Sequence, residues 1–440
     1  MNDKDIIESS LQQKNKIPTR TAIVGVWGMG VLEDECERSL CELERLVDTA
    51  GGECVVKLTQ GKDSFDVRTC IGKGKVETLR ESCEFCSVEL VVFDLELTPS
   101  QIRNLEEELG VEVIDRSMLI LDIFAIHAKS KEGKLQVELA QLKYTAPRLI
   151  GKGKDMSRLG AGIGSRGPGE SKLESDRRHL QRRIFALSEE LSEIEKNRNT
   201  MRSQRDRKGL FKIAIVGYTN AGKSTLMNTL TNADTLAEDK LFATLDTTTR
   251  RLKLPCGEEV LITDTVGFIN RLPHHLVNAF RSTLDETICA DLILNIVDAS
   301  DPEYIAQIEC TEKTLEDLGA GGKPTVYVFN KCDKASEPIM FAHIKDMRCV
   351  SISAKNRIGI DRLLEEIENV FYKGKRRVIF KIPFSKQGDV SRLYDLCTVE
   401  NIEYTDKCID VHAVADEKCR GMFSHYLPEC DRPRNEEDNI

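Results

Sequence analysis

A glycine-rich stretch near the middle of the chain could hold phosphate groups. Residues 217–224 read Gly-Tyr-Thr-Asn-Ala-Gly-Lys-Ser, between the apolar run Phe211–Val216 and a helical stretch. In such a loop the backbone N–H groups face phosphates, and the following helix start adds partial positive charge. Lys223 would reach the β and γ phosphates, and the Ser224 hydroxyl would coordinate Mg²⁺. The predicted nucleotide-binding residues here are Gly217, Tyr218, Thr219, Asn220, Ala221, Gly222, Lys223, Ser224 and Thr225.

A second motif follows the apolar run Val260–Thr263 and would complete the phosphate end of the site. Asp264 would hold Mg²⁺ through water, and the backbone N–H of Gly267 would meet the γ-phosphate. Alone, Asp-x-x-Gly is a weak indication, but here it stands where a P-loop protein needs its second part. The predicted site therefore also includes Asp264, Thr265, Val266 and Gly267.

Two further motifs could recognise the base. A strand-like run, Thr325–Phe329, leads into Asn330-Lys331-Cys332-Asp333, and a later strand precedes Ser353-Ala354-Lys355. The Asp333 carboxylate can accept hydrogen bonds from guanine N1–H and N2–H₂, which adenine does not offer. These motifs predict GTP binding in preference to ATP. The base-binding residues would be Asn330, Lys331, Asp333, Ser353, Ala354 and Lys355.

The segment 241–251 is the expected first switch of such a protein. Thr244 is the predicted ligand of Mg²⁺ and the γ-phosphate, with Phe242 and Ala243 beside it, while Thr248 and Thr249 remain alternatives. The catalytic contributions would come from Lys223, Thr244 and Gly267.

Two positions depart from a simple GTPase pattern. Phe268 follows Gly267 where a Gln could orient the attacking water, so intrinsic hydrolysis is predicted to be slow. Asn220 is a candidate ligand for K⁺ beside the phosphates, or else an ordinary turn residue.

The surrounding pattern predicts an α/β multidomain protein. Strands alternate with helices in residues 21–128, which predicts an α/β domain with a mostly parallel sheet. Expected strands are Thr21–Val26, Glu53–Leu58, Glu89–Phe93 and Val111–Ile114, and expected helices are Glu33–Thr49, Pro99–Leu109 and Arg116–His127. Residues 209–372 form the predicted P-loop domain, a mixed sheet flanked by helices. A small α+β domain is expected at 373–430, with disordered tails at 1–20 and 431–440.

Residues 129–208 predict a basic antiparallel helical hairpin. Its first helix would end at Pro147 and its second would run from Glu170 to about Lys208, where apolar residues recur at coiled-coil spacing. The chain carries a formal charge of −10, yet Lys129–Lys212 holds 21 Lys and Arg against 11 Asp and Glu. The glycine-rich tip, 151–169, could contact phosphates or could be a mobile linker, and the residues alone leave both open.

Composition favours a soluble cytoplasmic monomer. The 15 cysteines contain a single C-x-x-C pair, so reduced thiols are favoured over a metal site. Residues 1–20 lack the apolar stretch of a signal peptide, and no run is long enough to span a membrane. Outside the hairpin no long hydrophobic seam suggests an oligomer.

Across residues 21–370 the chain resembles the HflX family, ribosome-associated GTPases of the Obg–HflX group in the TRAFAC class. The resemblance is carried by Leu46–Gly52, Ile71–Lys75, Arg116–Ala125, Glu132–Leu142, Gly162–Glu170, Gly217–Thr225, Phe242–Asp246 and Asp264–Phe268. Thr247 stands where the family commonly has Pro, which leaves the stiffness of the first switch uncertain.

The resemblance implies that the protein binds the large ribosomal subunit and splits stalled or idle ribosomes under stress, with stimulated GTP hydrolysis. The hairpin would reach ribosomal RNA through Arg158, Arg166, Lys172, Arg177 and Arg178. The family's first domain is also reported to bind ATP, and here Gly72–Lys75 could touch a phosphate or could simply begin a helix.

Three alternatives stay open. A large-subunit assembly GTPase would use the same site at another moment. An ATP-driven rRNA remodeller would work through the N-terminal domain, although Asp333 argues against ATP as the main substrate. A GTP-binding scaffold without hydrolysis would be consistent with Phe268.

Overall fold

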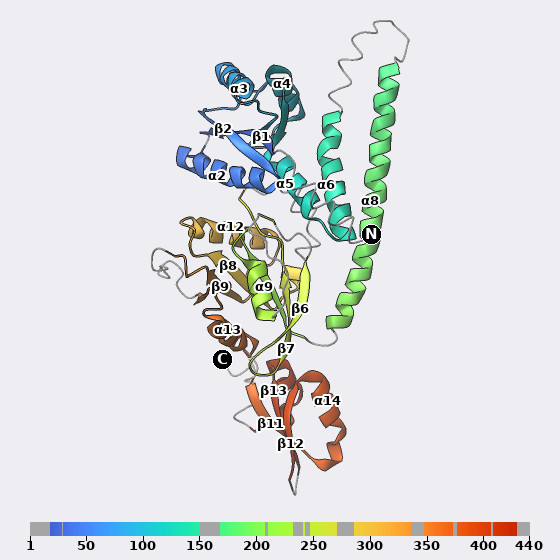
Figure 1. Ribbon diagram of the computed structural model, residues 1–440. Helices are drawn as coiled ribbons and strands as arrows, with labels where there is room; N and C mark the ends of the chain where they lie inside the picture. Colours follow the sequence, from blue (N-terminus) through green and yellow to red (C-terminus); the bar gives the residue numbers. More distant parts are fainter. Residues whose placement is uncertain are drawn as a thin grey trace, which may run out of the picture. The chain divides into compact units, whose positions relative to one another are not determined.

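The computed structural model describes residues 18–28, 30–149, 168–206, 210–231, 241–242, 247–270, 286–335, 347–372, 376–405 and 408–428. These residues belong to two compact units (Figure 1). The first unit lies within Met1–Lys253 and Glu259–Ile360. The second lies within Leu254–Glu258 and Asp361–Ile440.

The first unit begins with a four-stranded parallel sheet, as predicted. Its order is β2-β1-β3-β4, with strands β1 (Thr19–Trp27), β2 (Gly52–Gly61), β3 (Leu90–Phe93) and β4 (Glu112–Asp115). Its helices are α2 (Glu33–Thr49), α3 (Lys73–Phe85), α4 (Pro99–Leu109) and α5 (Arg116–His127).

Local capping explains why the helices start where they do. The Thr98 side chain accepts a hydrogen bond from the Gln101 backbone, and Pro99 follows in the first turn. The Asp115 side chain caps α5 in the same way. The sequence analysis allowed a helix to begin at Gly72–Lys75 but gave no bounds for α3, whose buried positions Val76, Leu79 and Cys83 are few among charged residues.

The hairpin consists of α6 (Lys131–Leu149) and α8 (Pro168–Asp206), which lie side by side in Figure 1. The prediction that Pro147 ends the first helix is wrong, because α6 continues to Leu149. A proline so near a helix end removes one backbone hydrogen bond without stopping the last turn. The second helix begins two residues before the predicted Glu170, at Pro168, since a first-turn proline lacks only an N–H that would be unpaired anyway. Leu187 in the predicted seam is fully buried.

The nucleotide motifs lie on a six-stranded mixed sheet of order β10-β9-β8-β5-β7-β6, in which only β6 is antiparallel. Its strands are β5 (Lys212–Gly217), β6 (Thr248–Lys253), β7 (Glu259–Asp264), β8 (Leu292–Asp298), β9 (Thr325–Asn330) and β10 (Arg348–Ser351). Helices α9 (Lys223–Thr231) and α12 (Tyr304–Asp317) belong to this region. The mixed sheet confirms the predicted fold class.

The second unit contains the small α+β module expected at 373–430, together with α13, which the sequence analysis placed in the P-loop domain. Its antiparallel sheet has the order β11-β13-β12, and Phe380, Leu393 and Val411 are buried in its core. The elements are α13 (Ile360–Phe371), β11 (Arg376–Ile382), η2 (Phe384–Lys386), α14 (Gly388–Leu396), β12 (Thr398–Tyr404), β13 (Ile409–Ala415), α15 (Glu417–Met422) and η3 (Ser424–Tyr426). Within the described part of the chain, no helix is long and apolar enough to cross a membrane.

Candidate functional site: the P-loop and its neighbours

The P-loop joins the end of β5 to the start of α9, as the strand–loop–helix pattern predicts. Gly222 has φ of 94°, and a Cβ atom there would lie 2.3 Å from Asn330 Nδ2. A side chain at position 222 would therefore require both a strained backbone and a displaced Asn330. The glycine is needed for this loop to close against the neighbouring motif.

Lys223 is buried within the loop. Its Nζ donates hydrogen bonds to the backbone oxygens of Gly217 (3.2 Å) and Tyr218 (2.7 Å). Burial lowers the pKa of Lys223 to about 8, against the opposing effect of Asp264. A Cβ atom on Gly267 would lie only 2.9 Å from this Nζ, so the backbone after β7 passes directly beside the lysine.

Ser224 and Asp264 meet where Mg²⁺ is predicted. The Ser224 hydroxyl donates to Asp264 Oδ2 (2.7 Å), and burial raises the pKa of Asp264. The other carboxylate oxygen, Oδ1, is buried, and none of the described residues donates to it. A buried, unsatisfied carboxylate oxygen beside a hydroxyl fits a hard cation such as Mg²⁺. When bound, the ion would neutralise charge on the phosphates.

Asn330 connects the P-loop to the base-binding motifs. Its side chain donates to the Ala221 backbone oxygen (2.9 Å) and accepts from the Ala354 backbone N–H (3.0 Å). A hydrogen bond from Ser353 lowers the pKa of the exposed Asp333, which keeps its carboxylate ionised to accept from a ligand. The structure thus brings together the P-loop and the motifs at Asn330–Asp333 and Ser353–Lys355. The first and last of these motifs are more than a hundred residues apart in the sequence.

Some predicted site residues direct their side chains into the protein. The Phe242 ring packs edge-to-face on Phe124, with centroids 4.8 Å apart, and Val266 is buried in the same cluster. The Thr265 hydroxyl donates to the Ile215 backbone oxygen at 2.7 Å. These residues could offer a nucleotide their backbone, but their side chains are engaged elsewhere.

Several predictions concern positions that the structure describes only in part. Ala243, Thr244, Arg158 and Arg166 lie outside the described residues, and for Lys172 only the helical backbone is described. The predictions for them stand as they were made.

The alternative switch threonines and Asn220 are described. Thr248 and Thr249 lie in β6, where the Thr249 hydroxyl is 3.0 Å from that of Thr263. Asn220 is exposed with φ of 59°, a conformation that suits a turn asparagine. The exposed Asn220 therefore remains open to both interpretations, turn residue and K⁺ ligand.

Phe268 is not oriented like a water-positioning residue. Its side chain is 2% exposed and packs in the core of the P-loop domain with Val216 and Ile293. Its backbone N–H donates to Gly217 O (3.1 Å), and its oxygen accepts from Thr219 N–H (2.8 Å). The backbone of Phe268 therefore links the chain after Gly267 to the P-loop by two hydrogen bonds. Its buried ring lies away from the solvent-facing loop.

The sequence analysis missed the contacts of Arg198, a residue of α8 that touches the predicted first switch and the chain at residue 286. Its guanidinium contacts Glu132 on α6 (3.1 Å), the Thr247 hydroxyl (3.4 Å) and Glu286 (3.4 Å). Thr247 lies in the predicted first switch just before β6, and Glu286 lies 19 residues after Gly267. Thr247 and Glu286 lie 49 and 88 residues from Arg198 in the sequence, so no local pattern could have indicated these contacts.

Three sequence families match this chain in the order of its domains. Residues 37–125 match the family "GTP-binding GTPase N-terminal", and 127–205 match "GTP-binding GTPase Middle Region". Residues 212–331 match the family described as "50S ribosome-binding GTPase".

Curated relatives extend this similarity over most of the chain. GTPase HflX of Caldanaerobacter subterraneus subsp. tengcongensis is 51% identical, covering 86% of this chain and 88% of that protein. GTPase HflX of Escherichia coli K12 is 40% identical, covering 84% and 87% respectively. A solved GTP-binding protein from Sulfolobus solfataricus, in complex with GDP, is 25% identical over 80% of this chain and 98% of that one, with a low TM-score of 0.43. Because HflX proteins 51% and 40% identical to it align with more than four fifths of its length, this chain belongs to the HflX family of GTPases.

Proposed function

We propose that this chain binds the large ribosomal subunit through its basic hairpin and couples Mg²⁺-dependent GTP hydrolysis to the separation of stalled or idle ribosomes. The match to a family described as "50S ribosome-binding GTPase" supports the partner. Asp333 and the loop at Ser353 support GTP as the nucleotide, with GDP and phosphate as products. The working compartment would be the cytoplasm, where ribosomes are found.

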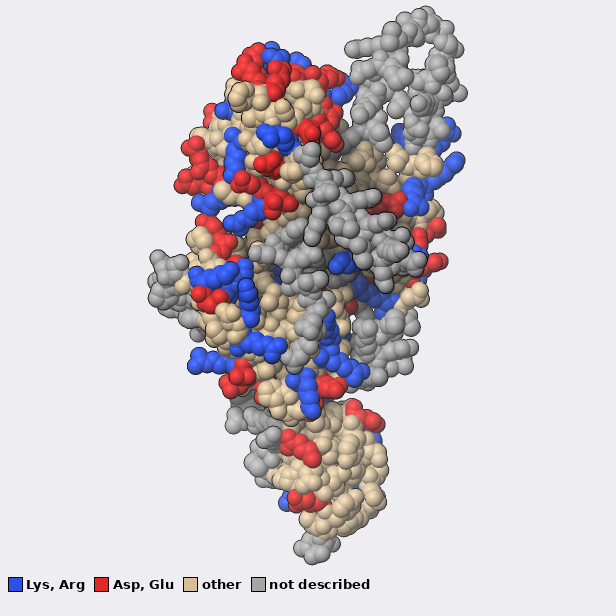
Figure 2. All heavy atoms as spheres, viewed as in Figure 1, with Lys and Arg blue, Asp and Glu red and all other residues tan. Residues whose placement is uncertain are grey.

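The observation that carries the proposal is that one helix combines exposed arginines with contacts to the predicted first switch and to Glu286. Arg177 and Arg178 are exposed on α8, and Figure 2 shows Lys and Arg side chains gathered along that part of the hairpin. Clustered surface Arg is suited to RNA phosphates. Further along the same helix, Arg198 contacts Thr247 and Glu286. A helix that binds RNA could therefore move the predicted first switch at Thr247 and the chain at Glu286.

The site also gives a reason for stimulation by a partner. Lys223 and Gly267 lie together at the phosphate end, where they would stabilise charge on the γ-phosphate. Phe268 is buried and cannot orient water from its observed position. A bound ribosome that orders the switches would supply what the isolated protein lacks.

The test is GTP turnover by the purified protein, alone and with large subunits or whole ribosomes, while sedimentation follows subunit separation. The key variant is Arg177→Ala/Arg178→Ala, which removes two exposed charges from α8. We expect ribosome stimulation to fall about tenfold, because several phosphate contacts contribute to such binding. Turnover without ribosomes should stay within about twofold of the parent.

A matched control removes the same charge elsewhere. Arg80→Ala/Arg362→Ala takes two basic side chains from exposed helix surfaces outside the hairpin, and it should keep full stimulation. Equal loss in both double variants would show only a general charge effect. Stimulation by precursor particles in preference to mature ribosomes would replace ribosome splitting with large-subunit assembly. Absence of stimulation by any ribosomal particle would refute the proposed partner.

A further inference from the structure

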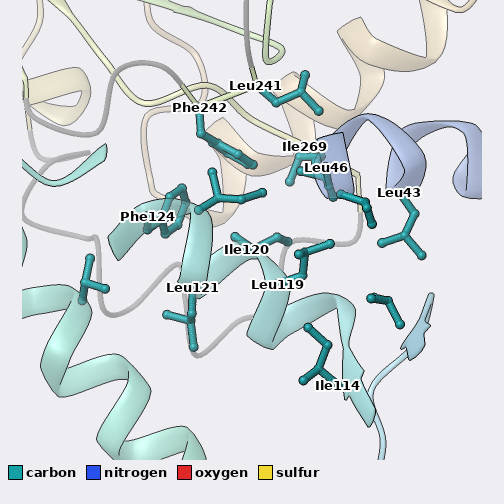
Figure 3. Close-up of a cluster of buried hydrophobic side chains, with 14 of the residues drawn as sticks. Leu43, Leu46, Ile114, Leu119, Ile120, Leu121, Phe124, Leu241, Phe242 and Ile269 are labelled. Atoms are coloured by element: carbon teal, nitrogen blue, oxygen red, sulfur yellow. The ribbon is translucent and has the colours of Figure 1, made fainter. Parts of the chain in front are cut away.

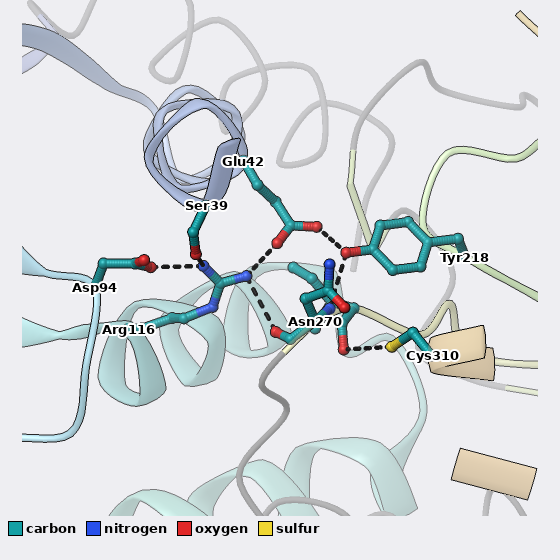
Figure 4. Close-up of polar contacts among 8 residues, drawn as sticks. Ser39, Glu42, Asp94, Arg116, Tyr218, Asn270 and Cys310 are labelled. Carbon is teal, nitrogen blue, oxygen red and sulfur yellow. Dashed lines mark hydrogen bonds and ion pairs between the residues drawn. The ribbon is translucent and has the colours of Figure 1, made fainter. Parts of the chain in front are cut away.

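A buried arginine joins the N-terminal domain to the chain just after Gly267 (Figure 4). Arg116, the first residue of α5, is 3% exposed. Its guanidinium forms ion pairs with Asp94 (2.7 Å) and Glu42, and contacts the Ser39 hydroxyl at 3.4 Å. It also donates to the backbone oxygen of Asn270 (3.1 Å), which lies 154 residues further along the chain.

The same network reaches the P-loop. The second carboxylate oxygen of Glu42 accepts a hydrogen bond from the Tyr218 hydroxyl. That hydroxyl in turn accepts from the Asn270 backbone N–H at 2.8 Å. Both polar groups of the Asn270 backbone are therefore bound, one by Arg116 and one by Tyr218. The P-loop at Tyr218 and the chain at Asn270 therefore share one set of partners from the N-terminal domain.

An apolar cluster surrounds this contact and fixes the residue in between (Figure 3). Ile269 is 1% exposed, among Leu46 of α2, Ile120 of α5 and Phe242. Its backbone oxygen also lies 3.7 Å from the Cys310 thiol of α12. The three residues after Gly267 are thus held differently: Phe268 in the P-loop domain core, Ile269 between the domains, and Asn270 by its backbone.

The charges of the network favour one protonation state. Burial alone would lower the pKa of Arg116, but the carboxylates of Glu42 and Asp94 outweigh it and raise that pKa. Burial and the Glu42 charge both raise the pKa of Tyr218, so its hydroxyl stays a donor. A buried pair of this kind costs little while complete but is costly to break on one side. It therefore favours a single arrangement of the four groups.

We propose that Arg116 and Glu42 are positioning residues for GTP hydrolysis. Acting through Tyr218 and the Asn270 backbone, they hold residues 268–270 against the P-loop and so fix Gly267 beside Lys223. Such pre-set geometry at the γ-phosphate lowers the cost of reaching the transition state. The proposal rests on GTP hydrolysis by this chain, but it does not involve the ribosome.

Two conservative variants test it in the full-length protein without ribosomes. Tyr218→Phe removes one hydroxyl, and Glu42→Gln removes one charge at nearly constant volume. Each should lower kcat about three- to tenfold, the effect of losing one hydrogen bond, with KM changed by about twofold at most. The preference for a non-hydrolysable GTP analogue over GDP should fall by a similar factor. Because both changes interrupt the same network, one at Tyr218 and the other at the Arg116–Glu42 ion pair, the double variant should lose less than the product of the two single effects.

Tyr327→Phe is the matched control. The Tyr327 hydroxyl also donates to a carboxylate, that of Glu312 on α12, and is not one of the groups of the Arg116 network. The kcat and nucleotide preference of Tyr327→Phe should match those of the parent protein. Its unfolding temperature should shift by about as much as that of the two test variants. Equal loss in Tyr327→Phe, unchanged values in both test variants, or a rise in kcat would each overturn the positioning role. A parent protein without turnover would refute hydrolysis itself, while the analogue-to-GDP preference would still decide whether the network positions Gly267.

Discussion

The base end and the phosphate end of the nucleotide site are built in different ways. At the base end, Asn330 links the P-loop to Ala354, and Asp333 pairs with Ser353, all from the same sheet domain. At the phosphate end, Tyr218 and Asn270 are held by Glu42 and Arg116 of the N-terminal domain.

From this difference we expect guanine recognition and GTP hydrolysis to depend on separate parts of the chain. Contacts formed entirely within one domain should persist when a neighbouring domain changes its position. Contacts shared between domains should respond to whatever moves the neighbour, since packed interfaces favour discrete arrangements. We therefore expect guanine affinity to be insensitive to the N-terminal domain, and kcat to be sensitive to it.

The largest expected effect comes from breaking the base end. Asp333→Asn should weaken GTP binding about a thousandfold, because the amide cannot accept both guanine N–H groups. Xanthosine triphosphate should regain most of that affinity, since its C2 carbonyl accepts from the new amide N–H. Competition binding with the two nucleotides measures the change.

The same variant also tests the independence of the two ends. With xanthosine triphosphate, kcat should remain close to the parent value for GTP, because the phosphate end is unaltered. A large loss of kcat with the matching nucleotide would show that the two ends are coupled, and the comparison drawn above would fail.

The next effect concerns Phe268 at the phosphate end. From sequence, replacing it by Gln would be expected to supply the missing water-orienting group and speed hydrolysis. The structure predicts the opposite outcome, because the side chain lies in the core with Val216 and Ile293. Phe268→Gln should cost about 3 kcal/mol of stability and give no gain in kcat. Thermal unfolding and single-turnover hydrolysis would measure both, and faster turnover would contradict the buried placement.

What the sequence could predict was local. The P-loop, the Asp264 motif and the guanine motifs are short patterns in defined strand–loop contexts, so their chemistry could be assigned without a structure. Helices α4 and α5 were predicted with their observed bounds, because capping groups such as Thr98 and Asp115 mark their starts.

What it could not predict depends on long-range contacts. Arg116 looked like an ordinary first residue of a helix, since its partners lie 22, 74 and 154 residues away. The burial of Phe268 depends on packing between β5, β8 and the loop after β7, and the register of β6 depends on β7. A hydrophobic residue after Gly267 is visible in the sequence, but the direction in which it points is not.

The smallest expected effect comes from Asp122 in α5, whose replacement should change the stability of the protein but not its kcat. Asp122 lies on the same helix as Arg116 and accepts a hydrogen bond from Gln141 of α6 (3.1 Å). Burial raises its pKa from 3.8 to about 6, and the Glu112 charge adds to this. Because the folded-state pKa is the higher one, wild-type stability should fall as pH rises from about 4 through about 6.

Asp122→Asn should abolish that fall and stabilise the protein by about 1–2 kcal/mol at neutral pH, after discounting for partial exposure. Unfolding midpoints of both proteins at the two ends of this pH range would measure it. Since the hydrogen bond of Asp122 is with Gln141 and not with a group of the Arg116 network, kcat should not change; a changed kcat would mean that hydrolysis follows the general stability of α5 and not the Arg116 network.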